Sequence, residues 1–260
     1  MTPPLPGHVC IAPHTDELYT QLAAMLMQAA FAAVKARGAF HLALSGGATP
    51  EPFYVHLMID VRCREFPWES THLWQVDERI VPMQDPRRNW KMIHETLVSQ
   101  TPMRSRPTHP MPVHDHSAAP GNTPARSYEI EMRAQIPSET LAGHELPRFD
   151  FVLLGMGSDA HTASLFPNSP ATREQKLLVA LNDGANVTPP PRLTLTYPAL
   201  NAAREVVVLV TGSAKHRTLQ HVAEHNASAG PDPTNLPITG IEPFDGELTW
   251  FLDAPAATGK

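Results

Sequence analysis

The sequence has few cysteines, no long apolar run and no excess of positive charge. Its 260 residues include only two cysteines, Cys10 and Cys63, which are too few for a disulfide framework and lack metal-ligand spacing. We therefore expect two reduced thiols and a cytoplasmic protein. Wholly apolar stretches such as residues 29–34 are far shorter than the roughly 20 residues that a membrane-spanning helix needs, so we expect no membrane segment.

The sequence also lacks a secretory signal and a basic surface. Residues 1–8 have neither a basic start nor a continuous apolar region. Lysine and arginine total 20 against 26 aspartates and glutamates, a net charge of −6, which argues against binding to nucleic acid or anionic membranes. The negative net charge still allows a small anionic ligand to bind, because a few local cations and backbone N–H groups can hold it. The hydrophobic fraction of 42% fills a substantial core and excludes wholesale disorder.

Short apolar strands alternate with helical patterns along the chain. Apolar residues recur at helical spacing over 18–35, and a strand is predicted at 40–44. Similar strands at 71–76, 149–154 and 205–210 are each followed by polar residues. Strands that are apolar throughout are typical of a parallel sheet buried on both faces. The sequence therefore predicts an α/β fold with a mainly parallel central sheet and helices on both faces.

Two stretches, 101–124 and 226–237, are rich in proline, histidine, asparagine or small residues and are predicted to be surface loops. The strand pattern continues on either side of both, so we predict a single domain over residues 1–260. Three histidines and an aspartate in the first loop fit no compact zinc pattern, so we predict solvated side chains and no metal there. These residues are His109, His114, Asp115 and His116.

The first polar motif is Ser45-Gly-Gly-Ala-Thr-Pro50, between a predicted strand and a predicted helix. Gly46 and Gly47 have no Cβ, so backbone N–H groups there can approach an anion, and the helix N-terminus adds a positive dipole end. Ser45 and Thr49 can donate hydroxyl hydrogen bonds. Neither a Walker motif nor G-x-G-x-x-G is present, and the loop fits either phosphate binding or a tight turn with a helix cap.

Three consecutive charges, Asp77, Glu78 and Arg79, follow the predicted strand at 71–76. Charged side chains directly after a buried strand need a partner or solvent. The guanidinium of Arg79 can form a bidentate interaction with an anionic or carbonyl-bearing ligand. The cluster is therefore either a solvated loop or part of a ligand site to which Asp77 and Arg79 contribute.

The third motif, residues 155–167, places His161 on a glycine-rich turn that we predict to join a strand to a helix. Asp159, two residues earlier, can fix the imidazole tautomer and stabilise its charged form. A histidine held in this way, with a reference pKa of about 6.5, suits a general base. The alternative is a structural histidine at a turn.

Two further cations, Arg192 and Lys215, lie at or beside predicted strand ends. Either alone could be a surface charge. Together, beside the glycine loop, they could close a phosphate site.

These segments, in this order, resemble the 6-phosphogluconolactonase family. The resemblance spans roughly residues 15–255 and implies a fold shared with glucosamine-6-phosphate deaminases and ribose-5-phosphate isomerases. It implies hydrolysis of 6-phospho-D-glucono-1,5-lactone to 6-phosphogluconate in the pentose phosphate pathway, without a cofactor. The matching segments are residues 44–50, 77–79 with Val81, Pro82 and Asn89, 154–167, 192–196 and the closing strand 247–253.

A mechanism consistent with the resemblance uses neutral His161 to take a proton from the water that attacks the lactone carbonyl. Asp159 orients the imidazole, and Arg79 or nearby backbone N–H groups stabilise the oxyanion. The phosphate is expected on a second group of residues, namely Ser45, Gly46, Gly47, Thr49, Arg192 and Lys215, with Asp77 also in the binding site.

Two positions depart from the family pattern. Ala160 stands where relatives usually have glycine, which costs roughly 1–2 kcal/mol if φ is positive there. Val76 stands where a small residue, commonly glycine, is usual, and its side chain could narrow the approach to the ligand.

Two alternatives remain open. One is a hexose-phosphate isomerase or deaminase, although deaminases typically carry His-Ile-Ala-Phe-Asn-Glu-Pro where this chain has His161-Thr-Ala-Ser-Leu-Phe-Pro167. The other is a non-catalytic sugar-phosphate sensor domain, although no basic helix-turn-helix segment is evident. We expect a monomer or a small homo-oligomer.

Overall fold

The computed structural model describes residues 4–101, 107–113, 123–184, 187 and 191–260. Its main feature is a seven-stranded sheet with the order β1-β12-β11-β8-β2-β3-β5, in which every neighbouring pair is parallel. The strands are β1 (His8–Ala12), β2 (Phe40–Leu44), β3 (Thr71–Gln75), β5 (Thr108–His109), β8 (Phe151–Gly155), β11 (Glu205–Val210) and β12 (Glu247–Asp253).

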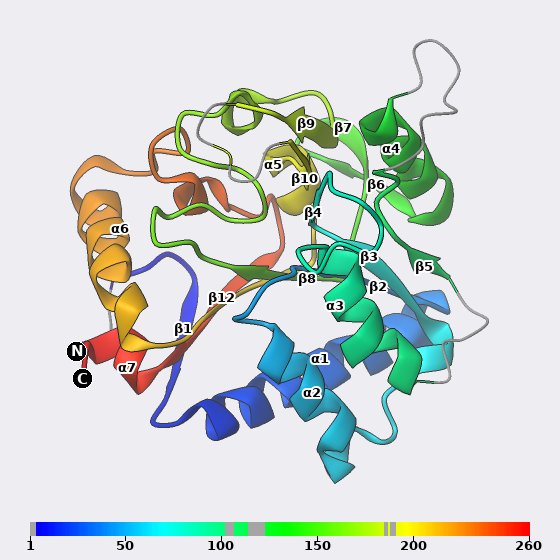
Figure 1. Cartoon of the computed structure of the whole chain (residues 1–260), viewed down its shortest axis with the longest axis horizontal. Helices are drawn as coiled ribbons and strands as arrows, with labels where there is room; N and C mark the ends of the chain where they lie inside the picture. Colours follow the sequence, from blue (N-terminus) through cyan, green and yellow to red (C-terminus); the bar gives the residue numbers. More distant parts are fainter. Residues whose placement is uncertain (1–3, 102–106, 114–122, 185–186, 188–190) are drawn as a thin grey trace.

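Helices cover both faces of this sheet (Figure 1). Side chains alternate between two hydrophobic cores along each strand: in β11, Val206, Val208 and Val210 join one core, and Val207 and Leu209 join the other. The second core is completed by α1 (Thr15–Arg37), α2 (Glu51–Ile59) and α3 (Asn89–Thr96). The first is completed by α4 (Pro124–Gln135), α5 (Tyr197–Leu200), α6 (His216–Ala229) and α7 (Ala254–Thr258). The predicted α/β architecture is confirmed.

Local sequence accounts for the boundaries of α1. Asp16 and Glu17 lie in its first turn and Lys35 and Arg37 in its last, where they complement the helix dipole. Gly38 ends the helix with a φ of 82° and donates its N–H to the carbonyl of Val34, a conformation that favours glycine.

A small antiparallel sheet lies over the first core. It has the order β4-β10-β9 and consists of β4 (Asp77–Arg79), β9 (Val179–Asn182) and β10 (Arg192–Leu195). The charged cluster that follows β3 is therefore a strand, and Glu78 is fully buried, so the solvated-loop alternative is wrong. A two-stranded hairpin, β6 (Ser138–Leu141) with β7 (His144–Pro147), lies elsewhere on the same side.

Several predicted loops and turns differ in the structure. Strand β5 lies within 101–124, and α6 continues to Ala229, inside 226–237. No helix directly follows β8, because Ala160, Ala163 and Asn168 have φ of 64°, 47° and 60°, which an α-helix cannot accommodate.

His109 is buried rather than solvated. Its Nδ1 lies 2.5 Å from Glu131 Oε1, and its ring stacks on Trp74 with centroids 3.7 Å apart, so the prediction for this residue is wrong. His114, Asp115 and His116 lie outside the described residues. Among the described residues, no group of three or more histidine, cysteine, aspartate or glutamate side chains is placed to hold a metal ion.

The described helices include none with both the length and the apolar character needed to cross a bilayer.

Candidate active site

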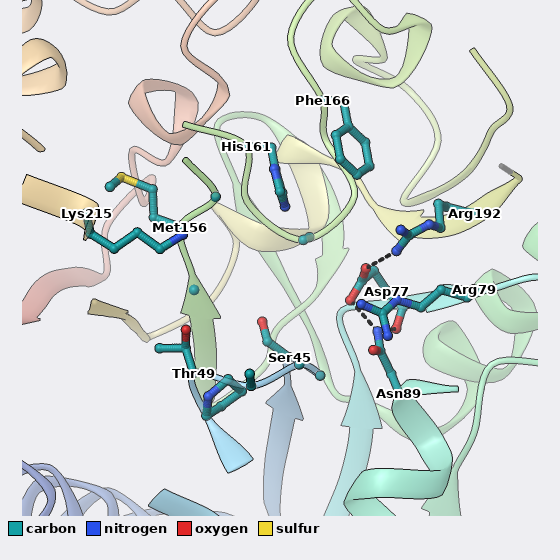
Figure 2. Close-up of a pocket in the computed structure, with 17 residues that line it drawn as sticks. Ser45, Thr49, Asp77, Arg79, Asn89, Met156, His161, Phe166, Arg192 and Lys215 are labelled. Atoms are coloured by element: carbon teal, nitrogen blue, oxygen red, sulfur yellow. Dashed lines mark hydrogen bonds and ion pairs between the residues drawn. The ribbon is translucent and has the colours of Figure 1, made fainter. Parts of the chain in front are cut away.

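The polar motifs meet at the carboxyl ends of four adjacent strands, β11, β8, β2 and β3. Open α/β sheets bind ligands at this edge. A cavity of about 330 Å³ lies there (Figure 2), large enough for a small ligand. Its lining residues are Ser45, Gly46, Gly47, Ala48, Thr49, Pro50, Asp77, Arg79, Asn89, Gly155, Met156, Gly157, His161, Ala163, Phe166, Arg192 and Lys215.

The glycine loop between β2 and α2 forms the floor of the cavity in Figure 2. Tyr54 of α2 donates its hydroxyl to the carbonyl of Ser45 over 2.6 Å, which ties the loop to the helix that follows it. Gly47 has a φ of 99°, a conformation that glycine adopts without strain. The hydroxyl of Ser45 is buried and has no hydrogen-bond partner in the structure.

Gly46 is required by close packing rather than by its φ. A Cβ at this position would lie 2.1 Å from Cγ and Oδ1 of Asn89, a distance that carbon and oxygen atoms do not tolerate. The amide of Asn89 therefore occupies the space that a side chain at position 46 would fill.

His161 points into the cavity from the turn after β8 (Figure 2). Its Nδ1 lies 2.5 Å from Asp159 Oδ1, and its side chain is 31% exposed. An ionised carboxylate only accepts hydrogen bonds, so the proton lies on Nδ1 and the lone pair of the neutral imidazole lies on Nε2. Burial raises the pKa of Asp159, but the hydrogen bonds and charge of His161 outweigh this effect and hold the pKa below its usual value.

Two neighbours fix the position of the imidazole. A Cβ at Gly157 would lie 2.1 Å from Nδ1 of His161, so the ring packs directly over the glycine backbone. On its other side the ring contacts Phe166, with centroids 4.5 Å apart. The same Phe166 ring lies 5.6 Å from the guanidinium carbon of Arg192 and so connects the imidazole to the cationic side of the cavity.

The cationic side is built by cross-strand pairing. Arg192 of β10 pairs with Arg79 of β4, and Thr194 pairs with Asp77. Because side chains alternate along strands, these residues share one face, and Glu78 lies on the opposite face. Burial lowers the pKa of Arg192, and Arg79 adds to this effect while Asp77 opposes it. Two adjacent guanidinium groups at a cavity wall favour an anionic ligand.

Asp77 is held by several partners. Its Oδ2 accepts a hydrogen bond from the hydroxyl of Ser164 over 2.5 Å and lies 3.8 Å from Arg192 Nη1. Its Oδ1 accepts from Nδ2 of Asn89 over 2.9 Å. The side chain is 8% exposed, so this carboxylate both lines the cavity and orders the residues around it.

Glu78 anchors the same wall from behind. Its carboxylate accepts hydrogen bonds from the backbone N–H groups of Arg79, Asn89 and Trp90 and from Nε of Arg88. These bonds satisfy the first turn of α3 and fix two cavity-lining residues to one buried group.

Lys215 reaches the cavity from the opposite side, on the short 3₁₀ helix Ser213–Lys215 that follows β11. In Figure 2 it lies beside Met156, with His161 between it and the two arginines. Burial lowers the pKa of its ammonium group, and Asp159 opposes this effect.

The structure brings together the residues that the sequence singled out. Nine of them line the cavity, and Asp159 contacts His161 directly. Sequence reasoning did not assign a role to Asn89, Met156 or Phe166. A signal was available for all three, since they lie in the quoted motif segments, but their contacts depend on tertiary packing.

The two departures from the family pattern have different outcomes. Ala160 has a φ of 64° and is fully buried, so this position carries the expected backbone strain. Val76 does not narrow the cavity, because its side chain is fully buried in the first core and is not among the lining residues.

The fold and site define an α/β protein with a polar cavity, lined by two arginines and a lysine, at the carboxyl edge of a parallel sheet. Residues 13–250 match the family described as glucosamine-6-phosphate isomerases/6-phosphogluconolactonase, and the chain belongs to this family. A protein named 6-phosphogluconolactonase from Synechocystis sp. is 39% identical over 226 residues, which cover 86% of each chain.

Longer relatives and solved structures agree with this family assignment. The GDH/6PGL endoplasmic bifunctional protein of Oryctolagus cuniculus is 38% identical over 94% of this chain, but the chain spans only 29% of that protein's length. The solved 6-phosphogluconolactonase of Trypanosoma brucei superposes with a TM-score of 0.80 and 25% identity, covering 97% of this chain and 98% of that one. The solved 6-phosphogluconolactonase of Leishmania guyanensis superposes with a TM-score of 0.78 and 26% identity, covering 98% of this chain and 99% of that one.

Proposed function

We propose that this protein hydrolyses 6-phospho-D-glucono-1,5-lactone to 6-phosphogluconate, a step of the pentose phosphate pathway. The observation that carries the proposal is a partly exposed imidazole with its lone pair on Nε2, in the same cavity as the guanidinium groups of two cross-strand neighbours and a glycine loop. One end of such a cavity suits proton abstraction from water, and the rest suits a phosphorylated sugar.

His161 acts as the general base in this proposal. Nε2 takes a proton from a water molecule as that water attacks the C1 carbonyl, and Asp159 stabilises the imidazolium that forms. The ring oxygen leaves C1 as the tetrahedral intermediate collapses and takes up a proton, which gives the open-chain acid. Arg79 or backbone N–H groups stabilise the oxyanion, a contribution of about 2.7–4 kcal/mol for a good donor.

The phosphate is bound away from the reacting carbonyl. We place it against the loop from Ser45 to Thr49, with Arg192 and Lys215 supplying positive charge from the two sides of the cavity. Binding energy from this remote group holds the lactone ring in position for attack.

A coupled assay tests the proposal. The lactone is generated enzymatically from glucose 6-phosphate, and 6-phosphogluconate is detected by its dehydrogenase, with spontaneous hydrolysis subtracted. We expect the protein to accelerate product formation in proportion to its concentration. An unchanged rate at micromolar protein would contradict the proposal.

The family description also includes glucosamine-6-phosphate isomerases. Formation of fructose 6-phosphate and ammonia from glucosamine 6-phosphate, measured with the same preparation, would support that activity. We expect no such formation, because the relatives named above are lactonases and His161 is followed by Thr-Ala-Ser-Leu-Phe-Pro.

We also propose a cytoplasmic location, since Cys10 and Cys63 are both free thiols. A monomer or small homo-oligomer remains our expectation, and size-exclusion chromatography with light scattering measures it.

A further inference from the structure

The turn that carries Lys215 is held by Asp253, the last residue of β12. Asp253 is 4% exposed, and both of its carboxylate oxygens lie 3.0 Å from the backbone nitrogen of Gly212. Gly212 is the N-cap residue of the 3₁₀ helix that ends at Lys215. A buried carboxylate therefore holds the point at which the chain turns from β11 toward the cavity.

The conformation of Gly212 gives this hydrogen bond its importance. Its φ is 88° and its ψ is 145°, and glycine can adopt many other conformations. The carbonyl of Gly212 accepts a hydrogen bond from the backbone N–H of Lys215 over 3.1 Å. Because an N–H bonds more strongly to an ionised carboxylate than to a neutral acceptor, Asp253 selects one conformation at the start of the turn that Lys215 closes.

The residue after Lys215 is held by the same segment. Nδ1 of His216 lies 3.1 Å from the carbonyl oxygen of Ala256 in α7, which packs against the start of α6 (Figure 1). Asp253 caps α7 by accepting a hydrogen bond from the N–H of Ala256 over 2.8 Å. One carboxylate thus fixes Gly212 directly and His216 through α7, and Lys215 lies between these two points.

Lys215 depends on this turn to reach the ligand space. Its ammonium group ends a flexible four-carbon chain, so its place at the cavity is set by the backbone that carries it. On the basis of the proposed function, in which Lys215 binds the phosphate, we infer that Asp253 is a positioning residue: it holds the turn from which Lys215 reaches the phosphate of the lactone.

Asp253→Asn separates the two roles of the carboxylate. The remaining oxygen can still cap α7, since asparagine caps helices about as well as aspartate. The NH₂ group replaces an acceptor that lies 3.0 Å from the nitrogen of Gly212, and two donors cannot pair. The measurement is the ratio of kcat/KM for phosphorylated gluconolactone to that for unphosphorylated gluconolactone. We expect this ratio to fall by about threefold to tenfold, with the loss for Lys215→Ala as its upper limit.

A double variant tests whether the effect passes through the lysine. In the Lys215→Ala background, Asp253→Asn should leave the ratio unchanged, because the ammonium group is already gone. Asp60→Asn is the matched control, since the side chain of Asp60 caps the 3₁₀ helix Val61–Cys63 but does not line the cavity. This variant should keep the wild-type ratio.

Gly212→Ala disturbs the same turn while leaving the carboxylate in place. Its φ of 88° is unfavourable for alanine, so this variant should also lower the ratio. The test therefore does not depend on whether Asp253→Asn folds.

Two results would overturn the inference. One is a wild-type ratio in Asp253→Asn and Gly212→Ala, even if their activity on both lactones falls alike, as a purely structural role predicts. The other is a fall in the ratio that Asp253→Asn produces equally in the Lys215→Ala background. A Lys215→Ala protein with the wild-type ratio would also overturn it, but would leave the proposed hydrolysis standing. Absence of any hydrolysis of the phosphorylated lactone by the wild-type protein would instead overturn the proposed function, and this inference with it.

Discussion

The two sides of the cavity are built differently. His161 lies on an irregular turn, is 31% exposed and has one hydrogen-bonded side-chain partner, Asp159. On the other side, Asp77 and Asn89 lie on or beside regular elements, are almost fully buried and are joined by hydrogen bonds to each other and to Ser164.

This difference suits the two roles that we propose for these groups. A general base must exchange protons with water, so it needs access to solvent and a free lone pair. A group that recognises a ligand by hydrogen bonding binds it more strongly when the group is buried, because the hydrogen bond is stronger there and its geometry is set in advance. The first side therefore depends on a single imidazole, and the second on a network.

The largest expected effect is on the imidazole side. His161→Ala should lower kcat by about 10²–10⁴-fold, the usual contribution of a general base, while KM changes little because the binding side is intact. Steady-state kinetics with the phosphorylated lactone measure both constants. His144→Ala, at an exposed position of β7, is the control, and equal kinetics for the two variants would remove His161 as the base.

Gly157→Ala tests the packing beneath the imidazole. The new Cβ would lie 2.1 Å from Nδ1 of His161, so the ring must move, and we expect kcat to fall by about 10–100-fold. Gly155→Ala is the matched control, since that position also lines the cavity but has no atom near an added Cβ. If both variants keep the wild-type kcat, the imidazole position is not critical.

Loss of positive charge from either wall of the cavity should affect affinity more than chemistry. Arg192→Ala and Lys215→Ala should each raise KM for the phosphorylated lactone by about tenfold, because a charge-assisted hydrogen bond contributes about 1.5–3 kcal/mol. The rate ratio between phosphorylated and unphosphorylated gluconolactone measures this effect. A variant whose ratio equals that of the wild type has lost no phosphate ligand.

His41, which is buried, and His72, which is partly buried, provide a third environment to compare with that of His161. Burial, with smaller contributions from neighbouring charges, lowers the pKa of His41 to about 3 and that of His72 to about 4. In the unfolded chain both titrate near 6.5. Below about pH 6.5 the unfolded chain binds protons that the folded protein does not, so the free energy of unfolding falls as pH drops toward 4.

His72→Phe should reduce this pH dependence while keeping an aromatic ring between His41 and His109. Urea unfolding at pH 7 and pH 5 measures it, and the wild-type protein should lose more stability between the two values than the variant. An equal loss in both proteins would show that His72 is not protonated selectively in the unfolded chain.

The smallest expected effect is at Ala160. Glycine there relieves the cost of a φ of 64° but increases the entropy of the unfolded chain, so Ala160→Gly should stabilise the protein by at most about 1 kcal/mol. Urea unfolding measures the change, and kcat should remain at the wild-type value. Destabilisation would show that the methyl group contributes more by packing than the backbone loses by strain.

The sequence predicts the central sheet well because its strands are short, apolar and separated by glycine or charge. Two strands of this sheet, β1 and β5, were not predicted, and β5 consists of two residues within a proline-rich stretch that carry no periodicity. Strand β4 was not predicted, because three consecutive charged residues do not suggest a strand. Its pairing with β10 and the burial of Glu78 against α3 explain why it forms.

The predicted site residues are easiest to pick out where they lie in one local motif, as around His161, and the structure brings them into one cavity. Asn89 also lies in a segment that resembles the family, but nothing in that segment indicates its contacts. Its importance follows from contacts with Gly46 and Asp77, which lie far from it along the chain or in another strand. Tertiary packing decides such roles, so they become visible only in three dimensions.

A crystal structure with 6-phosphogluconate bound separates the two ends of the cavity. We expect the C1 carboxylate within about 2.6–3.2 Å of a protonated Nε2 of His161 or of a water molecule held there. We expect the phosphate against the loop from Ser45 to Thr49. A product whose phosphate lies at His161, or that binds outside this cavity, would rule out the proposed arrangement.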